Sequence, residues 1–244
     1  MTVTFAGSGD AFGSGGRFQT CIVVDAPAIR FAIDFGASSL IALNKLGIDH
    51  NTIDAIVLTH LHGDHCGGIP FMLLDAMLGA KRKTPLTIAG PIDTKARLEQ
   101  VATALMPGIE SMSPKFPVEY VEMDSLREHQ VRGLKITTYP AEHTKLTNPT
   151  AVRVEIAGKV IAYTGDGDWS EHTPALARNA DLLIAESYFY EKPIRFHLNY
   201  STITNRRSEL TAKRIVLTHM SGEMLKNKHL VVEECANDGV VISL

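Results

Sequence analysis

The residues best suited to chemistry lie in one short segment, Thr59–Gly68, which reads THLHGDHCGG. Three imidazoles and one carboxylate occupy six positions in it: His60, His62, Asp64 and His65. Nitrogen and carboxylate ligands of this kind are typical of zinc sites. His60 and His62 alternate on an extended backbone and so point the same way, whereas Asp64 and His65 follow a glycine turn and can face a neighbouring point. So dense a cluster predicts two adjacent metal sites rather than a polar loop with incidental histidines.

The flanking residues predict the elements that hold this cluster. Ile53–Leu58 is apolar and rich in β-branched residues, which is typical of a buried strand, and Ile69–Leu78 has the character of a helix. A loop between a strand and a helix is a place where a rigid scaffold can aim side chains at a site.

Three more candidate ligands each follow a predicted strand: His143, Asp166 and His219. The segment Leu217-Thr218-His219 repeats the order of Leu58-Thr59-His60, which predicts that two strands deliver histidines to the same edge. Because one carboxylate has two oxygens, Asp166 could bridge two cations. Asp168 is the alternative bridging residue, although an aspartate in a turn needs no metal to explain it.

Three residues are candidates for supporting roles. Asp34 ends a predicted strand, where a buried carboxylate needs a partner; it could orient a ligand imidazole or cap the following helix. His197 precedes a predicted helix with a Ser/Thr cap and could present a protonated imidazole to an anionic substrate. Glu186, at the end of another strand, could hold that imidazole in the right tautomer.

A glycine-rich stretch, Gly7–Gly16, follows the first predicted strand. A dinucleotide-binding loop should open a helix, but the residues after this stretch predict another strand. Two interpretations remain. The glycines could serve tight turns with positive φ, or the stretch could be a flexible loop from which Ser14 or Arg17 reaches a substrate oxygen.

The pattern His-x-His-x-Asp-His after an apolar strand resembles the metallo-β-lactamase superfamily. The resemblance implies an α/β fold, a four-layer αββα sandwich with a two-metal hydrolytic site at one edge. The later segments are similar to its phosphodiesterase branch, which includes ribonuclease Z, phosphoribosyl cyclic-phosphate phosphodiesterase and the anti-Pycsar cyclic-nucleotide hydrolases. Those segments are Ala141–Thr144, Tyr163–Asp166, the stretch around His197 and Leu217–His219.

The same resemblance implies two divalent metal ions, with Zn²⁺ favoured over Mn²⁺ and Fe²⁺. One ion would be held by His60, His62, His143 and Asp166. The other would be held by Asp64, His65, Asp166 and His219. Asp64 and His197 are the expected catalytic residues, with His197 contacting the phosphate or donating a proton. The resemblance also supports Asp34 as an orienting residue, and Glu186 is expected to assist His197.

Two departures narrow the expected substrate. The chain lacks the long arm that ribonuclease Z usually inserts between His143 and Asp166, and its three cysteines do not supply the extra zinc site of the phosphoribosyl enzyme. We therefore expect a compact phosphodiesterase that hydrolyses a small diester, a cyclic nucleotide, with a hydroxide that the two metals activate. The alternatives are tRNA 3′-processing of the ribonuclease Z type, and lactonase, thioesterase or arylsulfatase activity.

Composition limits the remaining possibilities. The 244 residues are 45% hydrophobic and 21% charged, which predicts one globular domain over 1–244. The formal net charge of −3, with only short basic runs, argues against nucleic acid as a partner. Three scattered cysteines, no signal-peptide pattern and no apolar run of membrane-spanning length predict a cytoplasmic protein without a membrane partner. Family likeness predicts a homodimer.

Overall fold

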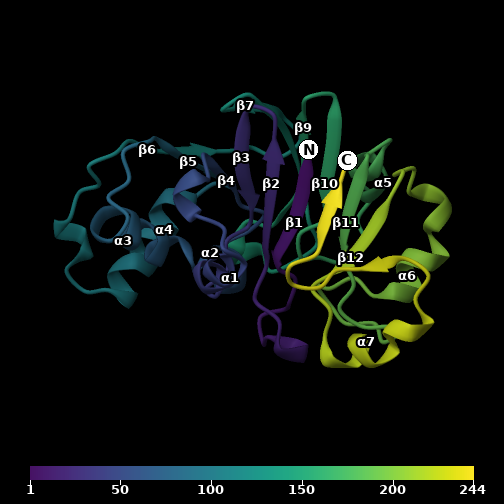
Figure 1. Cartoon of the computed structure of the whole chain (residues 1–244). Helices are drawn as coiled ribbons and strands as arrows, with labels where there is room; N and C mark the ends of the chain where they lie inside the picture. Colours follow the sequence, from purple (N-terminus) through teal and green to yellow (C-terminus); the bar gives the residue numbers. More distant parts are fainter.

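The computed structural model describes residues 1–244, and it contains two mixed seven-stranded β-sheets packed face to face with helices on both outer sides (Figure 1). One sheet has the strand order β14-β1-β2-β3-β4-β5-β6, and the other has the order β13-β12-β11-β10-β9-β8-β7. This is the four-layer αββα sandwich that the sequence predicts.

The first sheet and its helices come from the N-terminal half, completed by the last strand of the chain. Its strands are β1 (Thr2–Gly7), β2 (Cys21–Ala26), β3 (Ile29–Ile33), β4 (Ala55–Val57), β5 (Leu86–Gly90), β6 (Val118–Glu122) and β14 (Val241–Ser243). The helices of this half are α1 (Ser39–Leu46), α2 (Gly63–Cys66), α3 (Ile69–Leu78) and α4 (Thr94–Leu105).

The second sheet and its helices come from the C-terminal half. Its strands are β7 (Glu128–Val131), β8 (Leu134–Pro140), β9 (Thr150–Ile156), β10 (Lys159–Tyr163), β11 (Leu182–Glu186), β12 (Ile215–Thr218) and β13 (Glu234–Cys235). The helices are α5 (Thr173–Ala177), α6 (Tyr200–Asn205) and α7 (Gly222–Asn227). None of the helices in the molecule has the length and apolar character needed to cross a bilayer.

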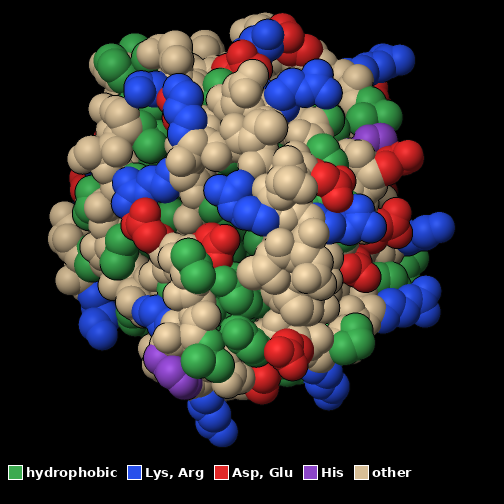
Figure 2. All heavy atoms as spheres, turned by 90° about the vertical axis from the view of Figure 1, so that its right-hand side faces the viewer, with side chains coloured by type: hydrophobic (Ala, Val, Ile, Leu, Met, Phe, Trp, Pro, Cys, Tyr) green, Lys and Arg blue, Asp and Glu red, His purple; other side chains and the backbone are tan.

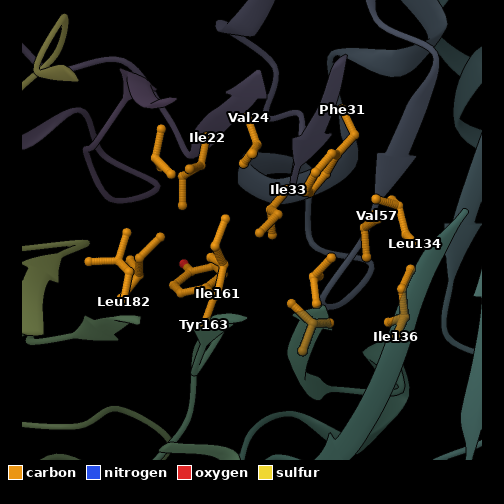
Figure 3. Close-up of a cluster of buried hydrophobic side chains, with 14 of the residues drawn as sticks. Ile22, Val24, Phe31, Ile33, Val57, Leu134, Ile136, Ile161, Tyr163 and Leu182 are labelled. Atoms are coloured by element: carbon orange, nitrogen blue, oxygen red, sulfur yellow. The ribbon is translucent and has the colours of Figure 1, made fainter. Parts of the chain in front are cut away.

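The main hydrophobic core fills the space between the two sheets. Side chains such as Val24 and Ile33 from the first sheet meet Ile136 and Ile161 from the second, and all four are fully buried (Figure 3). Burial of each such side chain contributes about 1.5–3 kcal/mol relative to exposure. Two further clusters pack the helices onto the outer sides of the sheets. The inner faces therefore fix how the two sheets lie against each other, and with them the positions of the strand ends.

Several strands of both sheets run in the same direction and end at one edge of the sandwich. In the first sheet β3, β4 and β5 are parallel, and in the second β10, β11 and β12 are parallel. β8 runs with them because it is antiparallel to β9, which is antiparallel to β10. The candidate metal ligands lie in the loops that follow these strands or in α2, and Glu186 is the last residue of β11, whereas Ser14 and Arg17 follow β1.

The structure departs from the sequence expectations in three local details. β4 is shorter than the predicted strand Ile53–Leu58. A strand that the sequence did not predict, β7, precedes β8, because Arg132 and Gly133 both take positive φ and close a two-residue hairpin. The cap of α6 is Asn199, whose side chain accepts a hydrogen bond from the Thr202 N–H, and not a serine or threonine.

Candidate metal centre

Three imidazoles converge at the first part of the centre: His60, His62 and His143. Nε2 of His60 and Nε2 of His143 each lie 3.1 Å from Nδ1 of His62. His60 and His62 come from the loop after β4, whereas His143 comes from the loop after β8 in the other sheet. A tetrahedral zinc ion with nitrogens at about 2.0–2.1 Å holds them about 3.3 Å from one another. The observed spacing therefore suits one shared cation.

Hydrogen bonds on the far side of the rings direct lone pairs into the centre. Nδ1 of His143 lies 2.8 Å from the carbonyl oxygen of Phe196, and Nδ1 of His65 lies 2.7 Å from a carboxylate oxygen of Asp34. A carbonyl or carboxylate oxygen only accepts, so each Nδ1 carries the proton. In the neutral imidazole, Nε2 then presents its lone pair to a metal.

The second part of the centre alternates carboxylates and imidazoles in a ring: Asp64, His65, Asp166 and His219. Nε2 of His65 lies 3.4 Å from Asp64 and 3.3 Å from Asp166. Nε2 of His219 lies 3.3 Å from each of the same two carboxylates. All four side chains are buried or nearly so, and the His60 and His65 ring centroids are 4.1 Å apart. The two ligand sets are therefore direct neighbours.

The second ligand set fits a cation for two reasons. Nε2 of His65 and Oδ1 of Asp166 are buried, yet neither makes a hydrogen bond despite their close approach. In addition, the carboxylates of Asp166 and Asp64 outweigh the effect of burial and raise the pKa of His65 well above its usual value. Similar forces raise the pKa of His219 to about 10. Protons balance the buried negative charge here, and bound metal would replace them.

The first ligand set has the opposite electrostatic character. Burial, followed by the neighbouring imidazole of His65, lowers the pKa of His60 well below its usual value. Burial and the imidazole of His143 likewise lower the pKa of His62. These rings are neutral at physiological pH, which is the form that binds a metal. Asp166 lies close to the ligand atoms of the second set and is not grouped with the three imidazoles of the first, so its bridging role stays a prediction.

Asp34 lies behind the centre and is completely buried. Besides His65, its carboxylate accepts hydrogen bonds at 2.8 Å from the backbone N–H and the hydroxyl of Thr59. The residue has φ of 58°, a left-handed conformation that costs energy for any non-glycine residue. These hydrogen bonds are the ones expected if Asp34 orients the imidazole of His65. The Asp34 side chain does not cap α1.

We expect Asp34→Asn to weaken metal binding by about 10–100-fold, because the amide cannot accept from both Thr59 and His65 as the carboxylate does. Metal titration of the apoprotein with a competing chelator measures this change. Asp75→Asn is the control, because Asp75 also pairs with a histidine, His50, but lies outside the centre. Equal metal affinity in wild type and Asp34→Asn would contradict the orienting role.

His197 stands at the mouth of the centre, held by three neighbours. Its Nδ1 contacts Oε1 of the fully buried Glu186 in a short hydrogen bond. The ring of Tyr188 stacks on its face, with centroids 4.7 Å apart, and the ring of His219 lies parallel at 6.1 Å. Although burial lowers the pKa of His197, the hydrogen bond to Glu186 raises it overall. The ring is thereby fixed in orientation and favours the protonated form.

The carboxylate of Glu186 joins several elements of the site. Its Oε2 accepts from the backbone N–H of Gly167 at 2.9 Å and of Leu198 at 3.2 Å. Its Oε1 also lies 3.4 Å from Nδ1 of His219. Glu186 therefore contacts His197, as expected from the sequence, and also the candidate metal ligand His219, a contact that the sequence did not predict.

Other residues considered from the sequence lie outside the centre. Asp168 accepts a hydrogen bond from the Trp169 N–H and behaves as a turn residue. In the glycine-rich loop, Ser14 donates its hydroxyl hydrogen bond to Asp10, and Arg17 donates to Asn237. Both side chains are thus engaged within the protein, which favours the interpretation of the glycines as turn residues; Gly13, Gly15 and Gly16 have positive φ.

Two contributors to the site escaped sequence reasoning. The Phe196 carbonyl fixes the tautomer of His143, and the Tyr188 ring supports His197. A backbone carbonyl carries no signal in the sequence, and the strained φ of 75° at Phe196 is equally invisible there. For Tyr188 the sequence offers one indication: the residue lies two positions after Glu186, at the end of a strand that leads to the site.

The fold, the three-histidine set and the neighbouring histidine–aspartate set define the class: the chain is a metallo-β-lactamase-fold protein of the phosphodiesterase branch. Residues 1–236 match the family described as Anti-Pycsar protein Apyc1, and the chain belongs to that family. The resemblance inferred from the motifs is confirmed.

Curated relatives and solved structures agree with this placement. The chain is similar to ribonuclease Z of Agathobacter rectalis, with 31% identity over 146 residues; the match covers 59% of this chain but only 45% of that protein. It is also similar to ribonuclease Z of Exiguobacterium sp., with 24% identity over 98% of this chain and 94% of that protein. The metallo-β-lactamase fold protein YhfI from Bacillus subtilis superposes with a TM-score of 0.78 at 21% identity, covering 99% of this chain and 98% of that one.

Proposed function

We propose that this protein is a metal-dependent phosphodiesterase that hydrolyses a small diester, a cyclic nucleotide. The observation that carries the proposal is the convergence of seven ligand-type side chains, from both sheets, in two adjacent sets beside His197, which Glu186 holds by a hydrogen bond. Family membership and the ribonuclease Z relatives support phosphodiester chemistry over the other hydrolytic reactions of this fold.

In this proposal His60, His62, His143 and Asp166 hold one divalent ion, and Asp64, His65, Asp166 and His219 hold the other. Two such ions, with Zn²⁺ best suited to the imidazole-rich ligands, would activate water near neutral pH and neutralise charge on the phosphate. Asp34 and the Phe196 carbonyl orient ligand imidazoles from behind. His197, protonated and held by Glu186, donates its proton to the oxygen that leaves phosphorus.

Two features of the chain favour a small substrate over a folded RNA. Between His143 and Asp166 there are only a short 3₁₀ turn, η4 (Lys145–Thr147), and the β9–β10 hairpin, with no arm that could grip a folded RNA. The face that carries α5 and α6 mixes basic and acidic side chains without a continuous basic stripe (Figure 2). These features favour a small diester over tRNA.

Ribonuclease Z activity is the second candidate, because the curated relatives carry that name. It differs from the first candidate in substrate and not in chemistry. Both need the same metal centre, so only substrate comparison separates them.

The test uses the purified full chain with its metal content measured. We expect hydrolysis of 3′,5′-cyclic nucleotides with kcat/KM of about 10⁴ M⁻¹s⁻¹ or more, and slower hydrolysis of bis(p-nitrophenyl) phosphate. A 2′,3′-cyclic nucleotide, a pre-tRNA, a lactone and an aryl sulfate serve as comparisons. Preferred cleavage of pre-tRNA would support the second candidate, and turnover of the lactone or sulfate alone would contradict phosphodiester chemistry.

A further inference from the structure

A hollow of about 360 Å³ lies directly beside the metal centre, with the candidate ligand His143 in its wall. This volume falls within the range of about 300–1,000 Å³ that is usual for small-molecule sites. Three loops enclose it: the loop between β5 and α4, the loop between β6 and β7, and the turn η4 after β8. A group attached to a phosphate at the metal centre could extend into it.

The lining of the hollow combines apolar and polar surfaces. Ile92, Met123 and Pro149 supply apolar surface. Ser125 and Lys145 supply a hydroxyl and an ammonium group, and Asp124 and Glu142 supply carboxylates that can accept from amino or hydroxyl groups. A nucleoside has the matching character, because the faces of its base are apolar while the edges of the base and the ribose carry hydrogen-bonding groups.

Each of the three loops exposes a large hydrophobic side chain at or beside the hollow. The exposed fractions are 44% for Ile92, 57% for Leu126 and 83% for Leu146. Ile92 lines the hollow, whereas Leu126 and Leu146 directly follow lining residues in the sequence. Exposed apolar groups gathered around a concave site indicate that something covers them when the site is occupied.

The same three loops also hold strained backbone. Asp93, Leu126 and Asn148 each have a positive φ, of 71°, 62° and 48°. The side-chain amide of Asn148 donates hydrogen bonds to the Ile92 carbonyl at 2.8 Å and to the Asp93 carboxylate at 3.3 Å, which joins two of the loops. Non-glycine residues in this conformation cluster at ligand sites, where the surrounding structure holds them in place.

We propose that this hollow binds the base and ribose of the nucleotide whose phosphate is hydrolysed at the metal centre. The inference rests on the proposed function, because it assumes a diester at the centre. It adds a specificity site: Ile92 packs on the base, Lys145 donates to acceptor atoms at its edge, and the pre-shaped loops orient the nucleoside relative to the metals.

The first experiment measures binding without turnover. The full chain is labelled with ¹³C at isoleucine δ1 methyl groups and titrated, in the presence of EDTA, with adenosine 3′,5′-cyclic monophosphate and the corresponding cytidine, guanosine and uridine compounds. We expect at least one of them to shift the Ile92 methyl signal through the ring current of the base. Ile41, which is 59% exposed on α1, is the matched control and should not move. An unmoved Ile92 signal with all four nucleotides at millimolar concentration would overturn the proposal.

The second experiment separates the hollow from the metal centre. In the metal-loaded protein, Ile92→Ala and Lys145→Ala should each raise KM for the preferred cyclic nucleotide about tenfold. They should leave kcat/KM for methyl p-nitrophenyl phosphate, whose non-leaving group is only a methyl, within about twofold. Leu230→Ala, at a 51% exposed leucine outside the hollow, should change the kinetic constants for neither substrate.

The outcomes distinguish the two proposals. If the wild type hydrolyses no phosphodiester while the Ile92 signal moves, the proposed function fails and nucleotide binding in the hollow stands. If the wild type is active but Ile92→Ala and Lys145→Ala have its KM for every nucleotide, the proposal that the hollow binds the nucleoside is wrong. A changed sedimentation mass in Ile92→Ala or Leu146→Ala would show that a second copy of the chain covers these residues, which also overturns the proposal.

Discussion

Asp166→Asn is expected to abolish phosphodiester hydrolysis, with kcat/KM falling roughly 10³-fold or more. The amide removes a negative charge from the second ligand set, in which Asp166 lies 3.3 Å from the imidazoles of both His65 and His219. Neutralisation of the phosphate by the metals is worth several kcal/mol, and each 1.36 kcal/mol corresponds to a tenfold change in rate. Metal analysis and kinetics on bis(p-nitrophenyl) phosphate, performed on the same sample, measure both effects.

Asp168→Asn is the matched control for this prediction. The residue lies two positions further along the same loop, and its side chain accepts only from a neighbouring backbone N–H. We expect its metal content and activity to stay within about twofold of wild type, as for a surface substitution outside a special feature. Full metal content and activity in Asp166→Asn would remove Asp166 from the centre, and loss in Asp168→Asn alone would identify the wrong aspartate.

His197→Ala should lower kcat for a cyclic nucleotide by about 10²–10⁴-fold, as expected for the loss of a general acid, while metal content stays at the wild-type level. His197 contributes no atom to the two proposed metal sets, and its Nδ1 is engaged by Glu186. The leaving alkoxide of a nucleoside needs a proton, whereas p-nitrophenolate is a stable anion. The loss on bis(p-nitrophenyl) phosphate should therefore be much smaller.

Comparison of the two leaving groups decides what His197 does. A large loss on the cyclic nucleotide with a small loss on the nitrophenyl ester supports proton donation. Equal losses on both substrates would assign His197 to phosphate binding, and retained activity on both would remove it from the mechanism. His229→Ala, at an exposed histidine on a 3₁₀ turn away from the centre, controls for the loss of an imidazole as such.

The fold was accessible from the sequence because its strands are strongly patterned. The strands before His60, Asp166 and His219 all lie where their residues predict them, although β4 is shorter than the predicted strand. The least predictable elements depend on partners distant in the chain. β14, for example, is a short strand that forms by pairing with β1 at the other end of the sequence. β7 depends on a hairpin turn, which hydrophobic periodicity does not detect.

The sequence by itself determined the chemical types of the ligands and the strand ends from which they project. Residue type and spacing within a loop are local properties, so His60 and His62 could be separated from Asp64 and His65 without a structure. Residue patterns alone did not assign His143 and His219 to a set; the family resemblance implied the assignment. The tertiary structure groups His143 with the first set and His219 with the second, because packing of the inner sheet faces sets the distance between strand ends. Only the structure shows the carbonyl of Phe196 behind His143 and the hollow between three loops. Residue types do not specify where a backbone carbonyl points or which loops enclose a cavity.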